Sequence, residues 1–420
     1  MEVLVARGAG LDVHRDSIVA AVLVGARKEK KELRTFGTTS SELAELRRWL
    51  QSHKVTHVAM EATGVYWLPV LEALEGQFEL VVANPHHVKK VPGRKTDACD
   101  AEWLARVLRY GLINGSFVPP AWQRQLRVLT RERSSLTHSI TRQRNMVLKL
   151  LESIGIKLAG VLSDVFGVSG MAILRALRDG NEDPEALSGL AKGRLRKKTA
   201  QIVAALKGRT LAPGARIVLA QHLRTLDLFD EQMQQLEAAI DAVVAPHSEV
   251  IARLRTIPGV NRILAIVILA EVGPDVAAFP TCAQFAAWSG TCPGNARSAK
   301  RSKAAGARKG NVHLTTALVQ AAVSASRAKK TTFIGEKYHR IKNRRGQKRA
   351  ALAGAHKIAI ALWHMLHNGE DFHDLGPASI PPRTRKRTID RLLRRLHDLG
   401  VDLTPLMKAA SNAVPQVSFS

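Results

Sequence analysis

Short apolar segments separated by polar, Leu-bearing segments define the first 110 residues of the chain. Strands are expected at residues 10–14, 17–24, 32–37, 55–61 and 78–83, and helices at 41–53, 66–75 and from about 97 to 110. Residues 84–93 read as a loop, because they combine Asn, Pro, Gly and His. Three successive strands followed by alternating helices and strands predict an α/β domain with a mixed sheet.

A different periodicity begins after residue 120. Two stretches carry apolar side chains close to heptad spacing: Leu126, Leu129, Leu136, Ile140, Val147, Leu150 and Ile154 in the first, and Leu219, Leu226, Phe229, Met233, Leu236, Ile240 and Val243 in the second. This spacing predicts long helices packed as a coiled coil. A helical hairpin within one chain and a seam between two chains both fit the pattern.

The remaining chain reads as helical. We expect four parts: an α/β domain at 1–120, a helical coiled-coil region at 121–250, a second helical domain at 251–370, and a basic tail at 371–420 that holds an amphipathic helix. The predicted fold class is therefore α/β plus all-α.

Charge narrows the choice of partner. The 420 residues include 63 Lys+Arg and 36 Asp+Glu, a formal net charge of +27, which indicates a nucleic acid as the partner. The longest apolar run, residues 263–270, is too short to cross a membrane, so no membrane role is expected. Three cysteines without a CxxC pair favour neither disulfides nor a Cys-based zinc site, and the predicted location is the cytoplasm.

Four acidic residues stand out in this basic chain. Asp12 and Glu61 end apolar strands, and Asp97 and Asp100 are spaced i, i+3 at the start of a predicted helix. Two acids at strand ends and two on a helix can hold a pair of divalent cations for phosphodiester cleavage. Carboxylate ligands suit Mg²⁺, which is the expected cofactor. Any one of these acids alone would more often be a turn or surface residue.

Two features of the second helical domain could contact phosphate. Residues 256–273 hold a Pro-Gly turn before an apolar helix, which fits either a helix-hairpin-helix element or a simple packed hairpin. A Gly-bearing basic segment without acids follows, and we expect it to be a short, flexible loop. Its predicted nucleic-acid contacts are Arg297, Lys300, Arg301, Lys303, Arg308 and Lys309. From the residues alone, Ser298 within this segment is a phosphate hydrogen-bond donor or has no special role.

The motifs GLDVH, AMEATGVYW, VVANP and KTDACDAEWLA together closely resemble the N-terminal domain of the DEDD transposases of bacterial insertion sequences, the insertion-sequence one-ten family, which is related to the pilin-gene invertases. The resemblance implies a RuvC-like, RNase H-type fold in a bacterial, nucleoid-associated protein. It also places the four metal-binding acids of that family on Asp12, Glu61, Asp97 and Asp100.

The segment CPGNARSAKRSKAAGARKGN resembles the C-terminal domain of the same family, and the family's nucleophilic serine then falls on Ser298. The chain departs from the family pattern in three places. No glycine separates Ala299 from Lys300, Thr315 replaces a common arginine, and Ser289 occupies a position that is usually alanine. Ser289 and Ser302 are therefore lesser candidates. The family further implies an element-encoded guide RNA (a bridge RNA), a composite site of acids and serine, and a homodimer or homotetramer.

The resulting hypothesis is a Mg²⁺-dependent DNA transposase or recombinase that excises and inserts an insertion sequence by strand cleavage and rejoining. The alternatives are a RuvC-type structure-selective endonuclease that hydrolyses DNA with water, a site-specific invertase, and a nucleic-acid scaffold without activity. A metal site at His356, His364 and His367 is disfavoured, because no acid or Cys completes a familiar ligand spacing.

Overall fold

The computed structural model describes residues 2–25, 30–62, 64–84, 88, 100–113, 115–293, 296–298, 301–303, 306, 310–327, 332–374, 376 and 382–400. These residues form two compact units, Met1–Pro119 and Pro120–Ser420. Each unit has its own core, so each is described separately. The finer division into four parts that the sequence suggests remains a prediction.

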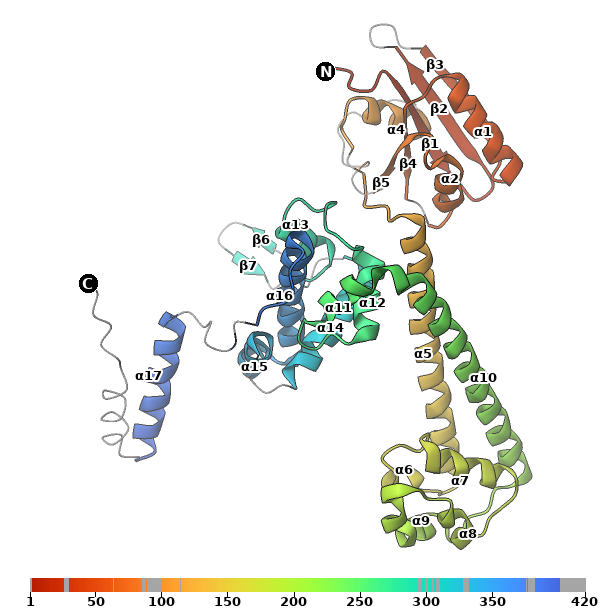
Figure 1. Cartoon of the computed structure of the whole chain (residues 1–420), viewed down its shortest axis with the longest axis vertical. Coiled ribbons are helices and arrows are strands. Elements are labelled where there is room, and N and C mark those ends of the chain that lie inside the picture. The colour runs from red at the N-terminus through yellow and green to blue at the C-terminus, as the bar shows by residue number, and fades with distance from the viewer. Residues whose placement is uncertain are drawn as a thin grey trace. The chain divides into compact units, whose positions relative to one another are not determined.

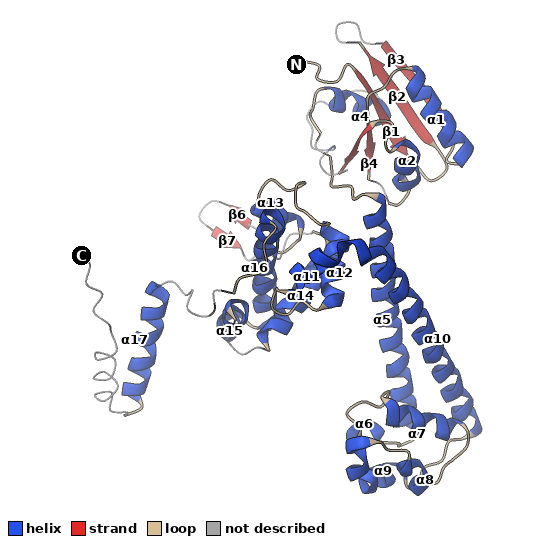
Figure 2. Cartoon of the chain, in the orientation of Figure 1, coloured by secondary structure: helices blue, strands red, loops and turns tan. Residues whose placement is uncertain are grey.

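A five-stranded mixed sheet forms the centre of the first unit (Figures 1 and 2). Its strands lie in the order β3 (Lys30–Phe36), β2 (Ile18–Val24), β1 (Arg7–Val13), β4 (His57–Glu61) and β5 (Glu79–Ala83). The first three strands along the chain pair antiparallel, whereas β4 runs parallel to β1 and β5 parallel to β4. The mixed sheet predicted from the sequence is confirmed and is consistent with the RNase H-like fold that the resemblance implies.

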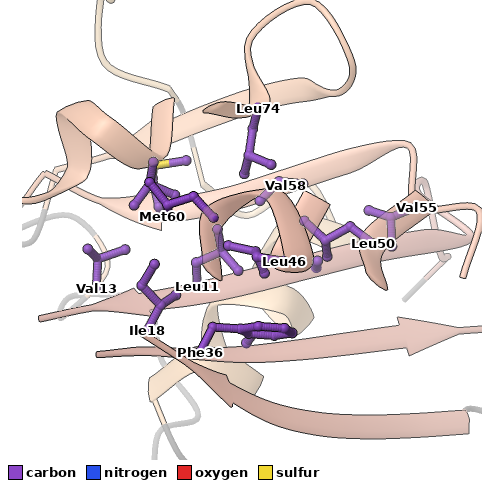
Figure 3. Close-up of a cluster of buried hydrophobic side chains, with 14 of the residues drawn as sticks. Leu11, Val13, Ile18, Phe36, Leu46, Leu50, Val55, Val58, Met60 and Leu74 are labelled. Carbon is purple, nitrogen blue, oxygen red and sulfur yellow. The ribbon is translucent and has the colours of Figure 1, made fainter. Parts of the chain in front are cut away.

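One face of the sheet is covered by α1 (Ser40–Ser52) and α2 (Trp67–Leu74). Leu46 and Leu50 of α1 pack on strand residues that include Leu11, Ile18 and Met60 (Figure 3), and all five side chains are fully buried. Because alternate residues of a strand point to opposite faces, this packing directs the residues between them, such as Gly10 and Asp12, to the other face.

The other face of the sheet is covered by α4 (Asp100–Arg109). The helix lies so close to β1 that a Cβ atom at Gly10 would lie 2.1 Å from Ala101 O and 2.4 Å from Ala105 N. Only glycine allows this approach. The buried Arg109 fixes the far end of the helix by donating from Nε to Val5 O at 3.1 Å. The first turn of α4 is thus held against the middle of β1.

Two long helices, α5 (Ala121–Ser153) and α10 (Pro213–Val244), lie side by side in the second unit (Figure 1). Four elements of the segment between them form a small helical core against their ends: α6 (Leu158–Val161), α7 (Val168–Arg178), α8 (Pro184–Gly189) and α9 (Thr199–Leu206), with a 3-10 turn at Gly193–Lys198. The heptad pattern did not predict this core, which buries Ile173, Ile202 and Leu223 together.

The pairing of α5 with α10 is only partly apolar. Gln143 Nε2 lies 2.7 Å from His222 Nδ1, and Arg133 pairs with Glu237 at 2.7 Å. No residue of α10 between Leu226 and Ile240 is buried. The long helices predicted from the heptads are therefore present, whereas coiled-coil packing remains a prediction.

A helical bundle completes the second unit. Its helices are α11 (Ser248–Arg255), which follows a 3-10 turn at Ala245–His247, α12 (Arg262–Val272), α13 (Cys282–Trp288), α14 (Val312–Ser326), α15 (Phe333–Arg345) and α16 (Gln347–Asn368). A short antiparallel hairpin of β6 (Ala296–Ser298) and β7 (Arg301–Lys303) lies between α13 and α14, and α17 (Pro382–Asp398) follows α16. No helix in the described part of the chain combines the length and apolar composition needed to cross a bilayer.

Candidate active site

Asp12 and Glu61 lie at the same edge of the sheet. Leu11 of β1 pairs in parallel register with Met60 of β4, so Asp12 and Glu61 occupy the next register position on adjacent strands. Both residues alternate with side chains of the α1–α2 core, which directs their carboxylates to the face that α4 covers. The sequence predicted an acid near the end of each of these two strands, and the register shows that the strands are neighbours.

Asp100 belongs to the same face of the sheet. It is the first residue of α4, and the contact of Ala101 with Gly10 places this helix start two residues along β1 from Asp12. The fold therefore directs three of the four predicted acids to one side of the sheet. Asp97, the fourth, lies outside the described residues, as does the start that the sequence predicted for this helix.

The neighbouring polar residues distinguish Asp12 from Glu102, an acid of α4 with a structural role. His14 Nε2 lies 3.2 Å from Asp12 Oδ2, and the Asp12 side chain retains 29% of its exposure. Glu102, also in α4, is instead neutralised by Lys31 at 2.8 Å and Arg106 at 3.0 Å. Glu102 therefore stabilises α4 against the sheet and is a poor candidate for a metal ligand.

The donor chemistry of this face fits a hard cation, because Asp12, Glu61 and Asp100 offer carboxylate oxygens. Within the described residues, however, no three His, Cys, Asp or Glu side chains are grouped closely enough to hold a metal ion. The three acids share a face of the sheet, and their assembly into a metal site with Asp97 remains a prediction.

A network of polar side chains surrounds the buried Glu271 at the end of α12, in the helical bundle. Its Oε1 accepts a hydrogen bond from Arg131 Nε at 3.0 Å, and its Oε2 accepts one from Asn311 Nδ2 at 2.8 Å. Arg127 Nε lies 3.3 Å from Glu271 Oε2. Burial alone would raise the pKa of the Glu271 carboxyl, but the bond from Arg131 and the charge of Arg127 hold that pKa below its usual value.

This network fixes the end of the basic segment. Asn311 is the N-cap of α14, and its Oδ1 accepts from the backbone amides of His313 and Leu314 at 3.1 Å each. Its own backbone amide donates to Trp288 O at 3.1 Å. Glu271 therefore anchors, through Asn311, the position where the chain leaves the basic segment and enters α14.

Two glycines close the base of the same segment. A Cβ atom at Gly310 would lie 2.3 Å from Gly290 N and 2.6 Å from Trp288 O, so the backbones touch where the segment begins and ends. Gly290 also has φ +74°, which a side chain would strain. The chain therefore leaves the end of α13 and enters α14 at points that lie in backbone contact.

Ser298 is the last residue of β6 and pairs with Arg301 of β7, and Arg297 pairs with Ser302. The sequence predicted a flexible loop here, and the structure corrects this: the segment forms a hairpin, because the backbones of residues 296–298 and 301–303 satisfy each other's hydrogen bonds. Among the predicted phosphate contacts, Arg297, Arg301 and Lys303 lie in the hairpin strands. Lys300, Arg308 and Lys309 lie outside the described residues.

The lesser serine candidate Ser289 is structural. Its side chain is fully buried, its Oγ donates to Ala286 O at 2.9 Å, and it lies 3.0 Å from Thr291 Oγ1. A DNA phosphate cannot reach a hydroxyl that the fold encloses in this way. Ser302 stays a secondary candidate, since its backbone lies in β7 opposite Arg297.

The Pro-Gly turn packs against a helix. A Cβ atom at Gly259, which has φ +86°, would lie 2.2 Å from Ala321 O of α14. Asn261 then caps α12 by accepting a hydrogen bond from Leu264 N at 2.9 Å. These contacts favour a packed helical hairpin over a phosphate-binding turn.

The histidines considered as metal ligands also have structural neighbours. His367 stacks on Trp363 at 4.5 Å between ring centroids, and His364 packs edge-on against the same ring at 5.0 Å.

Comparison with known proteins finds a match for the sheet of the first unit and for the helical bundle of the second. A family model described as transposase matches residues 9–156, and a second, described as the transposase IS116/IS110/IS902 family, matches residues 251–339. The chain belongs to the IS110 family of transposases. The matched ranges include the described acids of the sheet and also the hairpin that carries Ser298.

Two relatives of this IS110-family transposase extend over most of its length. The transposase for insertion sequence element IS1111A of Coxiella burnetii is 27% identical over 327 residues, which cover 76% of this chain and 80% of the relative. The y4qE protein of Sinorhizobium fredii, whose name also contains the word transposase, is 25% identical over 332 residues, 74% of this chain and 70% of that protein. The chain is accordingly an enzyme that acts on DNA.

The network around Glu271 was not identified from the sequence. One signal was available: Glu271 is the single acid in the otherwise apolar run from Ile263 to Val272, and a buried carboxylate requires a partner. The arginines that pair with it are about 140 positions earlier in the chain, so no local pattern could connect them.

Proposed function

We propose that this IS110-family transposase moves an insertion sequence by cleaving and rejoining DNA strands, with Asp12, Glu61, Asp97 and Asp100 holding Mg²⁺ and Ser298 acting as the nucleophile. The observation that supports the proposal most directly is the placement of Asp12, Glu61 and the start of α4 on one face of the sheet. The basic hairpin that carries Ser298 supports the second part.

The acids would bind and position the cation. Mg²⁺, when bound, supplies positive charge that stabilises the developing negative charge on the phosphodiester and its leaving oxygen. Asp12 and Glu61 are held at their positions by paired strands, and Asp100 by the packing of α4 on Gly10. His14 beside Asp12 limits the rotation of that carboxylate.

The serine would carry the DNA end covalently. Ser298 Oγ forms a bond to the phosphorus, the bond from phosphorus to the leaving DNA oxygen breaks, and the serine proton ends on that oxygen. A hydroxyl of the strand to be joined then attacks the same phosphorus. The bond from phosphorus to Ser298 Oγ breaks, and the proton of the attacking hydroxyl passes to Ser298 Oγ. The Arg and Lys residues of the basic segment would bind the phosphate and its neighbours.

Two further partners belong to this proposal. A structured guide RNA would select the DNA sites by base pairing, and the high net charge supports backbone contacts with such an RNA. The protein would also act as a homodimer or homotetramer. Light scattering of the purified chain would measure this self-association.

A strand-cleavage assay tests the acidic half. Asp12→Asn, Glu61→Gln and Asp100→Asn are each expected to lower Mg²⁺-dependent cleavage of an element-junction DNA by roughly a hundredfold or more, because each removes a negatively charged ligand. Asp16→Asn is the matched control: its side chain is 87% exposed in the turn after β1, so cleavage should stay at the wild-type rate.

The outcomes separate this proposal from its alternatives. Equal cleavage by Asp12→Asn and Asp16→Asn would refute the acidic site. Cleavage that needs the acids but persists in Ser298→Ala would instead indicate a RuvC-type endonuclease that uses water. Binding without cleavage by every protein, including the wild type loaded with its guide RNA, would indicate a scaffold.

A further inference from the structure

Three cations lie together on α15 and α16 with no acid to balance them. Lys337 and Arg340 are spaced i, i+3 on α15, and Lys337 is within hydrogen-bonding reach of Lys357 on α16, which packs against it (Figure 1). We call these three residues the α15–α16 basic cluster. Among the described residues, no carboxylate lies within ion-pair distance of any of the three.

Two acids close to the cluster in the chain or at the start of α15 form no ion pair with it in the described structure. Glu336 precedes Arg340 by one helical turn but makes no ion pair with it in the described structure. Asp374 Oδ1 accepts hydrogen bonds from Phe333 N at 3.0 Å and Gly376 N at 2.8 Å, so it caps the start of α15. The cluster therefore has no internal counter-charge.

The neighbouring positive charges destabilise the protonated form of Lys337. Partial burial and the charges of Lys357 and Arg340 lower the pKa of the Lys337 ammonium to about 8. Its remaining favourable contact is weak, because Lys337 Nζ lies 5.9 Å from the centroid of the Phe333 ring. Lys337 and Lys357 are half-buried and Arg340 is exposed, and like charges that are held together in this way are stabilised when an anion binds between them.

The cluster is connected to the start of the basic segment. His356, the residue before Lys357, places its Nδ1 3.5 Å from Thr291 Oγ1 and 3.9 Å from Cys292 Sγ. Thr291 and Cys292 lead from α13 toward the hairpin that carries Ser298. Burial and the charges of Lys357 and Lys337 also lower the pKa of His356, which favours its neutral form.

We propose that the α15–α16 basic cluster binds a backbone phosphate of the DNA substrate, distinct from the phosphate that reacts with Ser298. The site would hold a strand by its backbone without reading its sequence. The choice of DNA rests on the proposed function, since the cluster adjoins the segment that would cleave the strand. The binding itself requires no cleavage and can be tested without it.

Competitive labelling of lysines with acetic anhydride, resolved by mass spectrometry, measures this site directly. The full-length protein is labelled across a range of pH in EDTA, alone and with a short mixed-sequence DNA duplex. Lys337 in the free protein should label with a midpoint near pH 8, because its ammonium loses its proton there. The bound duplex should raise this midpoint and lower Lys337 labelling at about pH 8.5 by at least roughly threefold, because a phosphate favours the protonated form.

Variants and ligands distinguish the alternatives. Lys357→Gln should raise the Lys337 midpoint in the free protein and reduce its protection by DNA. Lys207→Gln removes the same charge from an exposed position in the turn after α9 and should preserve both. Protection by the duplex at concentrations where inorganic phosphate has no effect supports a DNA-backbone site. Protection by an RNA hairpin or by inorganic phosphate with none by the duplex, or a Lys337 midpoint that the saturating duplex does not move, would overturn the proposal.

Discussion

Replacing the buried carboxylate that organises the helical bundle is expected to loosen the base of the basic segment. Glu271→Gln keeps the shape of the side chain but removes its charge and turns one acceptor oxygen into a donor. The Glu271 side chain is 1% exposed and faces Arg127, which is 16% exposed, and Arg131, which is 43% exposed. The substitution therefore leaves one arginine buried without its counter-charge.

The magnitude follows from what each partner loses. Breaking a buried ion pair from one side costs about 3–5 kcal/mol. Arg127 retains bonds from Nε to Ala270 O at 2.9 Å and from Nη2 to Glu271 O at 2.6 Å, and Arg131 is partly solvated. These remaining contacts place the expected loss at the lower end, about 3 kcal/mol in the free energy of opening α12 and α14.

Hydrogen exchange of the α12 and α14 amides measures this quantity without assuming that the two units unfold together. A loss of about 3 kcal/mol corresponds to a fall in protection of roughly a hundredfold. Glu237→Gln is the control, because its pair with Arg133 leaves Glu237 48% exposed and should be worth about 1 kcal/mol or less. Equal, small effects of the two substitutions would refute the reasoning.

The same network predicts a pH dependence. The folded-state pKa of Glu271 lies below its ordinary value of 4.5, so its contribution to stability is present above that value and is lost as the pH falls through the folded pKa. The difference in protection between the wild type and Glu271→Gln should accordingly shrink in that acidic range. A difference that grows as the pH falls would contradict this sign.

Three further predictions concern separate parts of the molecule. Gly10→Ala should destabilise the first unit by about 3 kcal/mol in thermal or urea unfolding, because α4 must move, whereas Gly115→Ala meets Val81 at an ordinary 3.7 Å and should be nearly neutral. Ser289→Ala should cost about 1 kcal/mol in unfolding yet retain strand cleavage, and loss of cleavage in a folded Ser289→Ala protein would contradict its structural role. His53 has a raised pKa through its bond to Trp49 O and its contact with Glu32, so its NMR titration midpoint should fall in Glu32→Gln. Stability from the pair should be present between the lowered pKa of Glu32 and the raised pKa of His53, and should be lost as the pH rises through the His53 midpoint.

Local periodicity explains why the first unit could be predicted well. Four of its strands, β1, β2, β4 and β5, concentrate apolar residues over a few positions, and the acids Asp12 and Glu61 follow such positions directly. Because adjacent parallel strands end at the same edge of a sheet, acids that follow such strands can lie close together, and the sequence could therefore indicate these two acids as site residues. The close approach of α4 at Gly10 had no local signal, since glycine also occurs in ordinary strands and turns.

Long-range pairing explains what the sequence did not show in the second unit. The core formed by α6–α9 arises from short helices that pack on one another and on the ends of α5 and α10, and no local pattern shows which helices pack together. The Glu271 network joins residues far apart in the chain, and the contact of Gly290 with Gly310 closes a segment of twenty residues. Each feature depends on tertiary packing, which overrides local propensity.

The central claim is that this transposase cuts DNA through a serine that becomes joined to the phosphate. The most direct measurement incubates the guide-RNA-loaded protein with end-labelled element-junction DNA and Mg²⁺, denatures the mixture, and separates protein-linked DNA from free DNA. The account predicts a covalent adduct for the wild type and for Ser289→Ala, and none for Ser298→Ala or Asp12→Asn. Free cleaved ends without an adduct, formed equally by the wild type and Ser298→Ala, would contradict it.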